Sequence, residues 1–91
     1  MNQHSDLTAE EYAAARPYAL VIEWSDEDQV YIATAPDLVG CRTHGATRAE
    51  AAEMGEEAIA LVLASRAGRG QPLPPARFTA LDDASLVTAT R

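Results

Sequence analysis

The first clear alternation of residues along the chain runs through residues 18–24 and predicts a β-strand. Ala19, Val21 and Glu23 fall on one face of this segment. The opposite face carries larger side chains, namely Tyr18, Leu20, Ile22 and Trp24. Residues 30–35 alternate in the same way and predict a return strand. The acidic run 25–29 between them is typical of a hairpin loop, so the two segments predict an antiparallel hairpin.

A stripe of apolar residues with helical spacing predicts one long helix over about residues 48–67. Thr47 and Glu50 have the spacing of a capping box, in which each side chain accepts a hydrogen bond from the other residue's backbone N–H. The apolar arc consists of Ala51, Ala52, Gly55, Ala58, Ile59, Val62 and Leu63. Gly55 costs about 1 kcal/mol of helix propensity relative to alanine, which we expect a close approach of helix and sheet to offset. Gly68 predicts a left-handed cap at the end of the helix.

Weaker signals complete the predicted architecture. Leu7, Thr8, Glu11 and Tyr12 combine a hydrophobic staple with a capping box and predict a short helix that ends before Pro17. Residues 39–43 predict a third strand with a bulge at Gly40, and residues 85–90 have the character of a fourth. The fold class is therefore α+β, with a three- or four-stranded antiparallel sheet and one long helix packed on a face. We divide the chain into a tail and short helix over 1–17 and a single domain over 18–91.

Charge narrows the range of partners. The chain has a net charge of −7, with fourteen acids, seven arginines and no lysine. This balance opposes sequence-independent binding to nucleic acid and suits a basic protein partner. An alternative is that the acids only keep the domain soluble. One cysteine excludes an internal disulfide and a cysteine-based zinc cluster, and no apolar run is long enough to cross a membrane, so we expect a cytoplasmic protein.

No set of residues in the sequence indicates catalysis, a metal or a cofactor. Cys41 and His44 form half of a possible metal site, but no second pair completes it. We expect His44 to be exposed and Cys41 to be a small core residue. The acids at 26–28 lack the spacing and glycine of a calcium loop, and a solvated turn is the better interpretation.

The long helix carries two candidate surfaces. Glu50, Glu53 and Glu57 lie opposite the apolar arc, either as a solvated face or as an acidic surface that docks a basic partner. Met54 and Leu61 form a narrower apolar pair, either at the rim of the core or as a seam for another subunit. Because a small domain buries little apolar area by itself, we expect a homodimer or a higher even-numbered oligomer. Its interface would comprise Met54, Leu61, Leu86 and Val87.

An ordered set of short motifs resembles the HicB-like antitoxin family over about residues 18–75. The matching residues are Pro36-Asp37-Leu38, Gly40-Cys41, Gly45, Thr47, Glu50-Ala51, Glu57-Ala58-Ile59 and the Pro-Leu-Pro after the helix. Two positions depart from the pattern, because the family often has a polar, asparagine-like residue where this chain has Met54 and an acid where it has Ala46.

The resemblance implies a partial ribonuclease-H-like fold, but not nuclease activity. Ribonuclease H chemistry requires several carboxylates around paired metals, and the first predicted strand offers only Glu23. The resemblance further implies an antitoxin that binds and neutralises a small basic toxin that cleaves messenger RNA. Because the sequence stops at Arg91, we expect a stand-alone member without the DNA-binding segment of many relatives. The alternative is an orphan HicB-like module that self-associates as a regulatory or scaffolding protein, and a small hydrolase is the least favoured interpretation.

Overall fold

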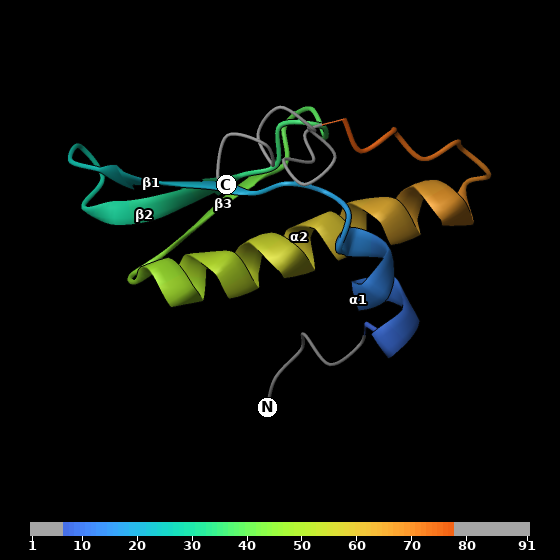
Figure 1. The fold of residues 1–91 in the computed structure, drawn as a ribbon, viewed down its shortest axis with the longest axis horizontal. Coiled ribbons are helices and arrows are strands. Elements are labelled where there is room, and N and C mark those ends of the chain that lie inside the picture. The colour runs from blue at the N-terminus through green and yellow to red at the C-terminus, as the bar shows by residue number, and fades with distance from the viewer. Residues whose placement is uncertain (1–6, 78–91) are drawn as a thin grey trace, which may run out of the picture.

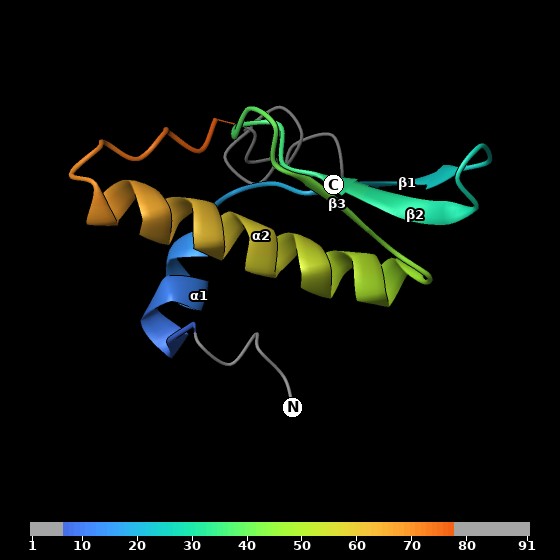
Figure 2. The same ribbon diagram turned by 180° about the vertical axis from the view of Figure 1, so that it is seen from behind.

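The computed structural model describes residues 7–77 and has two layers (Figures 1 and 2). The elements in chain order are α1 (Ala9–Ala15), β1 (Val21–Ser25), β2 (Val30–Thr34), β3 (Arg42–Gly45) and α2 (Arg48–Gly68). The antiparallel strands form one sheet in the order β1-β2-β3. Helix α2 lies across one face of the sheet, and α1 packs against α2. This arrangement confirms the predicted α+β class; the possible strand at 85–90 lies outside the described residues.

The predicted hairpin is confirmed, but β1 begins three residues later than expected. The backbone N–H of Tyr18 donates to the carbonyl of Ala15 at 3.1 Å, so the chain at Tyr18 is still completing the turn after α1. At the other end of β1, Ser25 pairs with Val30 across a four-residue loop. Gln29 closes that loop in the left-handed region, with φ 57°, and its N–H donates to the Ser25 carbonyl at 2.7 Å.

Two successive turns occupy the place where the third strand was expected to begin. The Leu38 N–H donates to the carbonyl of Ala35 at 3.1 Å, and the Cys41 N–H donates to the carbonyl of Leu38 at 2.9 Å. Gly40 is the third residue of the second turn and has φ 81°, the value that a type II turn requires there. Gly40 therefore serves a turn and not a bulge, and β3 begins only at Arg42.

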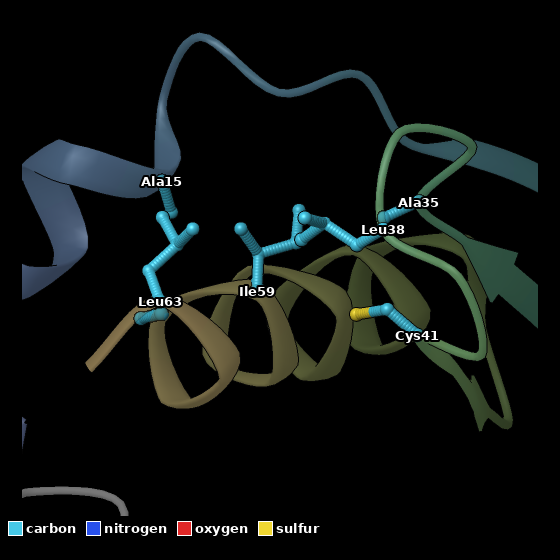
Figure 3. Packing of buried hydrophobic residues seen from close by; sticks show 7 residues of the cluster. Ala15, Ala35, Leu38, Cys41, Ile59 and Leu63 are labelled. Carbon is cyan, nitrogen blue, oxygen red and sulfur yellow. The ribbon is translucent and has the colours of Figure 1, made fainter. Parts of the chain in front are cut away.

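The core lies between α2, the turns and α1, and three of the seven residues in its buried cluster are alanines. Its cluster consists of Ala15, Ala35, Leu38, Cys41, Ile59, Ala60 and Leu63 (Figure 3). Small side chains let the layers approach closely. A Cβ at Gly55 would lie 2.8 Å from both Leu20 Cδ atoms and 3.3 Å from Ala33 Cβ. This contact confirms the expected close packing of α2 on the sheet.

Helix α2 begins where the sequence predicted, but only one of the two predicted capping-box hydrogen bonds forms. Thr47 Oγ1 accepts from the Glu50 N–H at 3.0 Å, as a cap should. The Glu50 carboxylate, however, accepts from the N–H of Ala46 at 2.6 Å and not from that of Thr47. Glu50 thus stabilises the connection between β3 and α2, one residue further back than a capping box requires.

The end of α2 corrects the prediction at Gly68. That residue is still helical, and the left-handed residue is Gly70, with φ 70°. The Gly70 N–H donates to the Ala67 carbonyl at 3.1 Å, and the Gln71 N–H donates to the Arg66 carbonyl at 2.8 Å. These two bonds define a Schellman motif with Gly70 at its left-handed position.

Two hydrogen bonds fix the proline-rich segment of residues 70–77 that follows α2, which we call the connector. The Tyr18 hydroxyl donates to the carbonyl of Pro74, and the Arg77 N–H donates to Asp37 Oδ2 at 2.8 Å. These bonds join residues far apart in the sequence. The connector is therefore held against both the turn after α1 and the turn after β2.

Candidate functional site

The sheet does not bring Glu23 and His44 together. Both are cross-strand partners of Ile32, which lies between them on β2. Two strand spacings separate them by roughly 10 Å, too far for one proton-transfer pair or for a shared metal. Within residues 7–77, no group of three or more histidine, cysteine, aspartate or glutamate side chains is arranged to hold a metal ion.

Cys41 is a core residue, as predicted. Its side chain is 7% exposed, and it points toward α2 in Figure 3. Burial raises the pKa of the Cys41 thiol, so the thiol is protonated at neutral pH. His44 is exposed and alternates with the residues of β3 that face α2. The Cys-x-x-His spacing therefore has no metal-binding geometry and gives no activated nucleophile.

The candidate residues of α2 share one surface. Met54 follows Glu50 by four residues, and Leu61 follows Glu57 by four, so each apolar side chain lies one turn from a glutamate. Leu61 is 51% exposed, Glu50 and Glu53 are exposed, and Met54 and Glu57 are half-buried. We call Glu50, Glu53, Met54, Glu57 and Leu61 the outer strip.

Sequence reasoning assigned the glutamates and the apolar pair of the outer strip to different partners. Because their side chains alternate along the same turns of α2, a partner that covers the glutamates also covers the apolar pair. Glu50 has the local role at Ala46 in addition. Leu86 and Val87, the other predicted interface residues, lie outside the described residues.

A second surface was not predicted, and it lies where the hairpin meets the first turn of α2. The Trp24 and Tyr31 rings are cross-strand neighbours with centroids 5.0 Å apart at an interplanar angle of 67°. The Arg48 guanidinium carbon lies 4.9 Å from the centroid of the Tyr31 ring. The Trp24 indole N–H donates to Asp26 Oδ1 at 3.2 Å. We call Trp24, Tyr31, Arg48 and the acidic turn 26–28 the hairpin patch.

The sequence could have predicted the aromatic pair of the hairpin patch, but not its arginine. Once Ser25 is paired with Val30, the register makes Trp24 and Tyr31 neighbours. The sequence gives no comparable signal for Arg48, because only the packing of α2 on the sheet brings its guanidinium to Tyr31.

A shallow hollow lies between α1 and the second half of α2. Its volume is about 470 Å³, and its lining consists of Glu10, Glu11, Ala14, Ala60, Leu63, Ala64, Ala67, Gly68 and Leu73. Glu11 is engaged at the start of α1, where its carboxylate accepts from the Thr8 N–H at 2.9 Å. Most of the remaining lining side chains have no hydrogen-bonding atom, so the hollow suits an apolar group.

Comparison with known proteins identifies the family. Residues 18–86 match the family model described as HicB_like antitoxin of bacterial toxin-antitoxin system. This match begins after α1 and includes the whole sheet, α2 and the connector. Neither the curated proteins nor the solved structures gave a match. Among the described residues, neither helix is both long and apolar enough to cross a membrane. The resemblance read from the motifs is confirmed, and the chain belongs to the HicB-like antitoxins of bacterial toxin–antitoxin systems.

Proposed function

We propose that this protein is an antitoxin that binds and neutralises a small basic toxin that cleaves messenger RNA. The observation that carries the proposal is the family match over residues 18–86. The net charge of −7 supports it, because a toxin that binds RNA needs a basic surface and this chain attracts such a surface.

Electrostatics explains how the bound chain would inhibit. The toxin surface that receives the phosphates of RNA is the surface most attracted to carboxylates. Glu53 and Glu57, with Glu50 beside them, present such groups along the outer strip of α2. A bound antitoxin would occupy the RNA-binding surface and shield the catalytic residues of the toxin. Neutralisation then requires neither catalysis, nor a metal, nor a cofactor, nor direct contact of this chain with nucleic acid.

We infer that the sheet and α2 are a partial ribonuclease-H-like fold and that residues 18–91 form one domain. We further infer that the complex acts in the cytoplasm, where messenger RNA is translated.

Co-expression tests the proposed function directly. The probe is a small basic protein encoded in a reading frame adjacent to the one for this chain, produced from an inducible promoter. Induction should stop growth and degrade messenger RNA, and this chain expressed from a second promoter should restore both. The purified proteins should form a complex at low salt that weakens as salt screens the charges. Growth arrest that persists despite abundant folded antitoxin would refute the proposal.

A self-associating orphan module is the second candidate, and the exposure of Leu61 favours it. Leu61 is 51% exposed and lies seven residues, or about two helical turns, after the half-buried Met54, so the two lie on one side of α2 and form an apolar line there. On this proposal a second copy of the chain covers the line, and Leu61→Asp shifts the homodimer or higher even-numbered oligomer toward monomer. Light scattering that reports a monomer for the intact chain at tens of micromolar would end the oligomer proposal.

A further inference from the structure

The side chains of the hairpin patch are of the types that carry most binding energy in protein interfaces. Tryptophan, tyrosine and arginine are enriched among the residues whose truncation weakens complexes most. Here Trp24, Tyr31 and Arg48 form a continuous row from β1 across β2 to the first turn of α2. Trp24 remains 47% exposed although its ring already packs on Tyr31. The row therefore offers a large aromatic surface that the described part of the chain does not bury.

The row is held in place before any partner arrives. The edge-to-face contact with Tyr31 and the hydrogen bond to Asp26 fix the Trp24 ring from two sides. Arg48 stacks on Tyr31, so its guanidinium is also positioned. A partner that docks here pays little conformational entropy for ordering these side chains.

Charge identifies the chemistry of the partner. The exposed turn contributes three carboxylates, from Asp26, Glu27 and Asp28, against the one positive charge of Arg48, so the hairpin patch has a net charge of −2. The face of an indole ring also attracts a cation. The patch therefore suits a lysine or arginine beside an apolar side chain. It opposes the phosphates of RNA, which would otherwise suit an exposed aromatic pair.

We propose that the hairpin patch is the anchor through which this chain holds the basic toxin, an inference that rests on the proposed antitoxin function. A cationic side chain of the toxin lies between the Trp24 ring and the acidic turn, and a neighbouring apolar group covers the rest of the indole. The outer strip has a different part in binding. Glu57 follows Arg48 by nine residues and so lies on the opposite side of α2, where it attracts the toxin through solvent.

Trp24 is the only tryptophan of the chain, so one label reports on this surface. Fluorotryptophan is incorporated into this chain alone, and the purified toxin from the neighbouring reading frame is added. One fluorine resonance should shift and saturate at the stoichiometry of the complex. A neutral quencher that reaches the indole in the free chain should lose access to it in the complex.

Variants separate anchoring from general attraction. Trp24→Ala should raise the dissociation constant by at least roughly 30-fold, the loss expected for an interfacial hot spot, while Trp24→Phe should lose less. The double variant Glu27→Gln with Asp28→Asn changes only exposed turn residues and should weaken binding several-fold. Its matched control is Glu10→Gln with Glu56→Gln, which removes the same charge from exposed positions on α1 and α2. The control should bind the toxin within about twofold of the unmodified chain.

The outcomes distinguish this inference from the function on which it rests. If the toxin does not bind the unmodified chain, the proposed function and the anchor both fail. If calorimetry shows that the toxin binds, but the quencher still reaches Trp24 in the complex and Trp24→Ala binds equally well, only the anchor proposal fails. Protection of Trp24 that grows with chain concentration alone would assign the patch to a second copy. Protection by a single-stranded RNA oligonucleotide would assign it to nucleic acid. Either result overturns the proposal.

Discussion

Gly45 offers the sharpest test of how β3 and α2 fit together, and we predict that Gly45→Ala is strongly destabilising. A Cβ at this position would lie 2.5 Å from the nitrogen of Ala51, 2.8 Å from the carbonyl carbon of Glu50 and 2.9 Å from Cα of Ala51. Carbon atoms in contact normally stay about 3.5–4.0 Å apart. Since all three neighbours are backbone atoms of the first turns of α2, no side-chain rotation relieves the clash.

The magnitude follows from what must move. Only Ala46 and Thr47 connect β3 to α2, so separating the two elements strains the cap bonds at 2.6 Å and 3.0 Å. Overpacking costs about 1–3 kcal/mol, and losing a cap costs about 1 kcal/mol more. Replacing a strand glycine by alanine also lowers the conformational entropy of the unfolded chain, which stabilises the folded protein by up to about 1 kcal/mol. We therefore expect a loss of about 2–3 kcal/mol, against a total of about 5–14 kcal/mol for a domain of this length.

Urea denaturation followed by far-ultraviolet circular dichroism measures this loss, and the expected fall in Tm is about 10–20 °C. Two other glycines serve as controls. Gly68→Ala meets no atom within 4 Å and should be neutral or stabilising. Gly55→Ala meets chiefly the flexible end of Leu20, and the gain in helix propensity offsets that contact, so its change should stay within about 1 kcal/mol. A Gly45→Ala variant as stable as the parent would refute the close approach of β3 and α2.

Three further predictions concern stability. Gln29→Val should cost about 1–2 kcal/mol in thermal unfolding because Gln29 has φ 57°, whereas Gln29→Asn should be nearly neutral. Glu50→Ala should lose about 1 kcal/mol in urea, and Glu50→Gln, which keeps an oxygen to accept from Ala46, should lose much less. Burial raises the pKa of the Cys41 thiol in the folded protein above the value of about 8.5 that is expected in the unfolded chain. The protonated thiol therefore contributes its full stabilisation below the unfolded pKa, and this stabilisation is lost as pH rises through the folded pKa. The unfolding free energy should therefore fall more steeply at alkaline pH than that of Cys41→Ala, and an identical pH dependence of the two would contradict the buried thiol.

Local signals explain why much of the fold was predictable from the sequence. Strand alternation located the hairpin, and Thr47 fixed the first residue of α2 correctly at Arg48. Both signals depend on neighbours within a few residues. The errors arose where two local interpretations competed. Gly68 and Gly70 are equally permissive glycines, and only the hydrogen bonds to the last carbonyls of the helix distinguish them.

Contacts between distant residues could not be predicted in this way. Alternation continues back to Tyr18, but the bond from its N–H to the end of α1 keeps it out of the strand. The hydroxyl bond from Tyr18 to Pro74 joins segments 56 residues apart. The hairpin patch was missed for the same reason, since Arg48 reaches Tyr31 only after α2 has packed on the sheet. A candidate interface of this kind follows from tertiary structure and not from a motif.

The structure also changes how the acidic composition should be interpreted. Several carboxylates that a charge count treats as equal have specific partners within the chain. Glu11 accepts from Thr8, Glu50 from Ala46, and Asp37 from Arg77. Removing any of these side-chain acceptors would weaken a helix start or release the connector, and a loss of toxin binding would then report on folding. The electrostatic part of the proposed function is therefore best tested at Glu53, whose exposed side chain adds charge without capping a helix and lies outside the hairpin patch. If antitoxin action depends on attraction through solvent, replacing Glu53 by glutamine should slow association and flatten its salt dependence, while the free energy of unfolding stays unchanged.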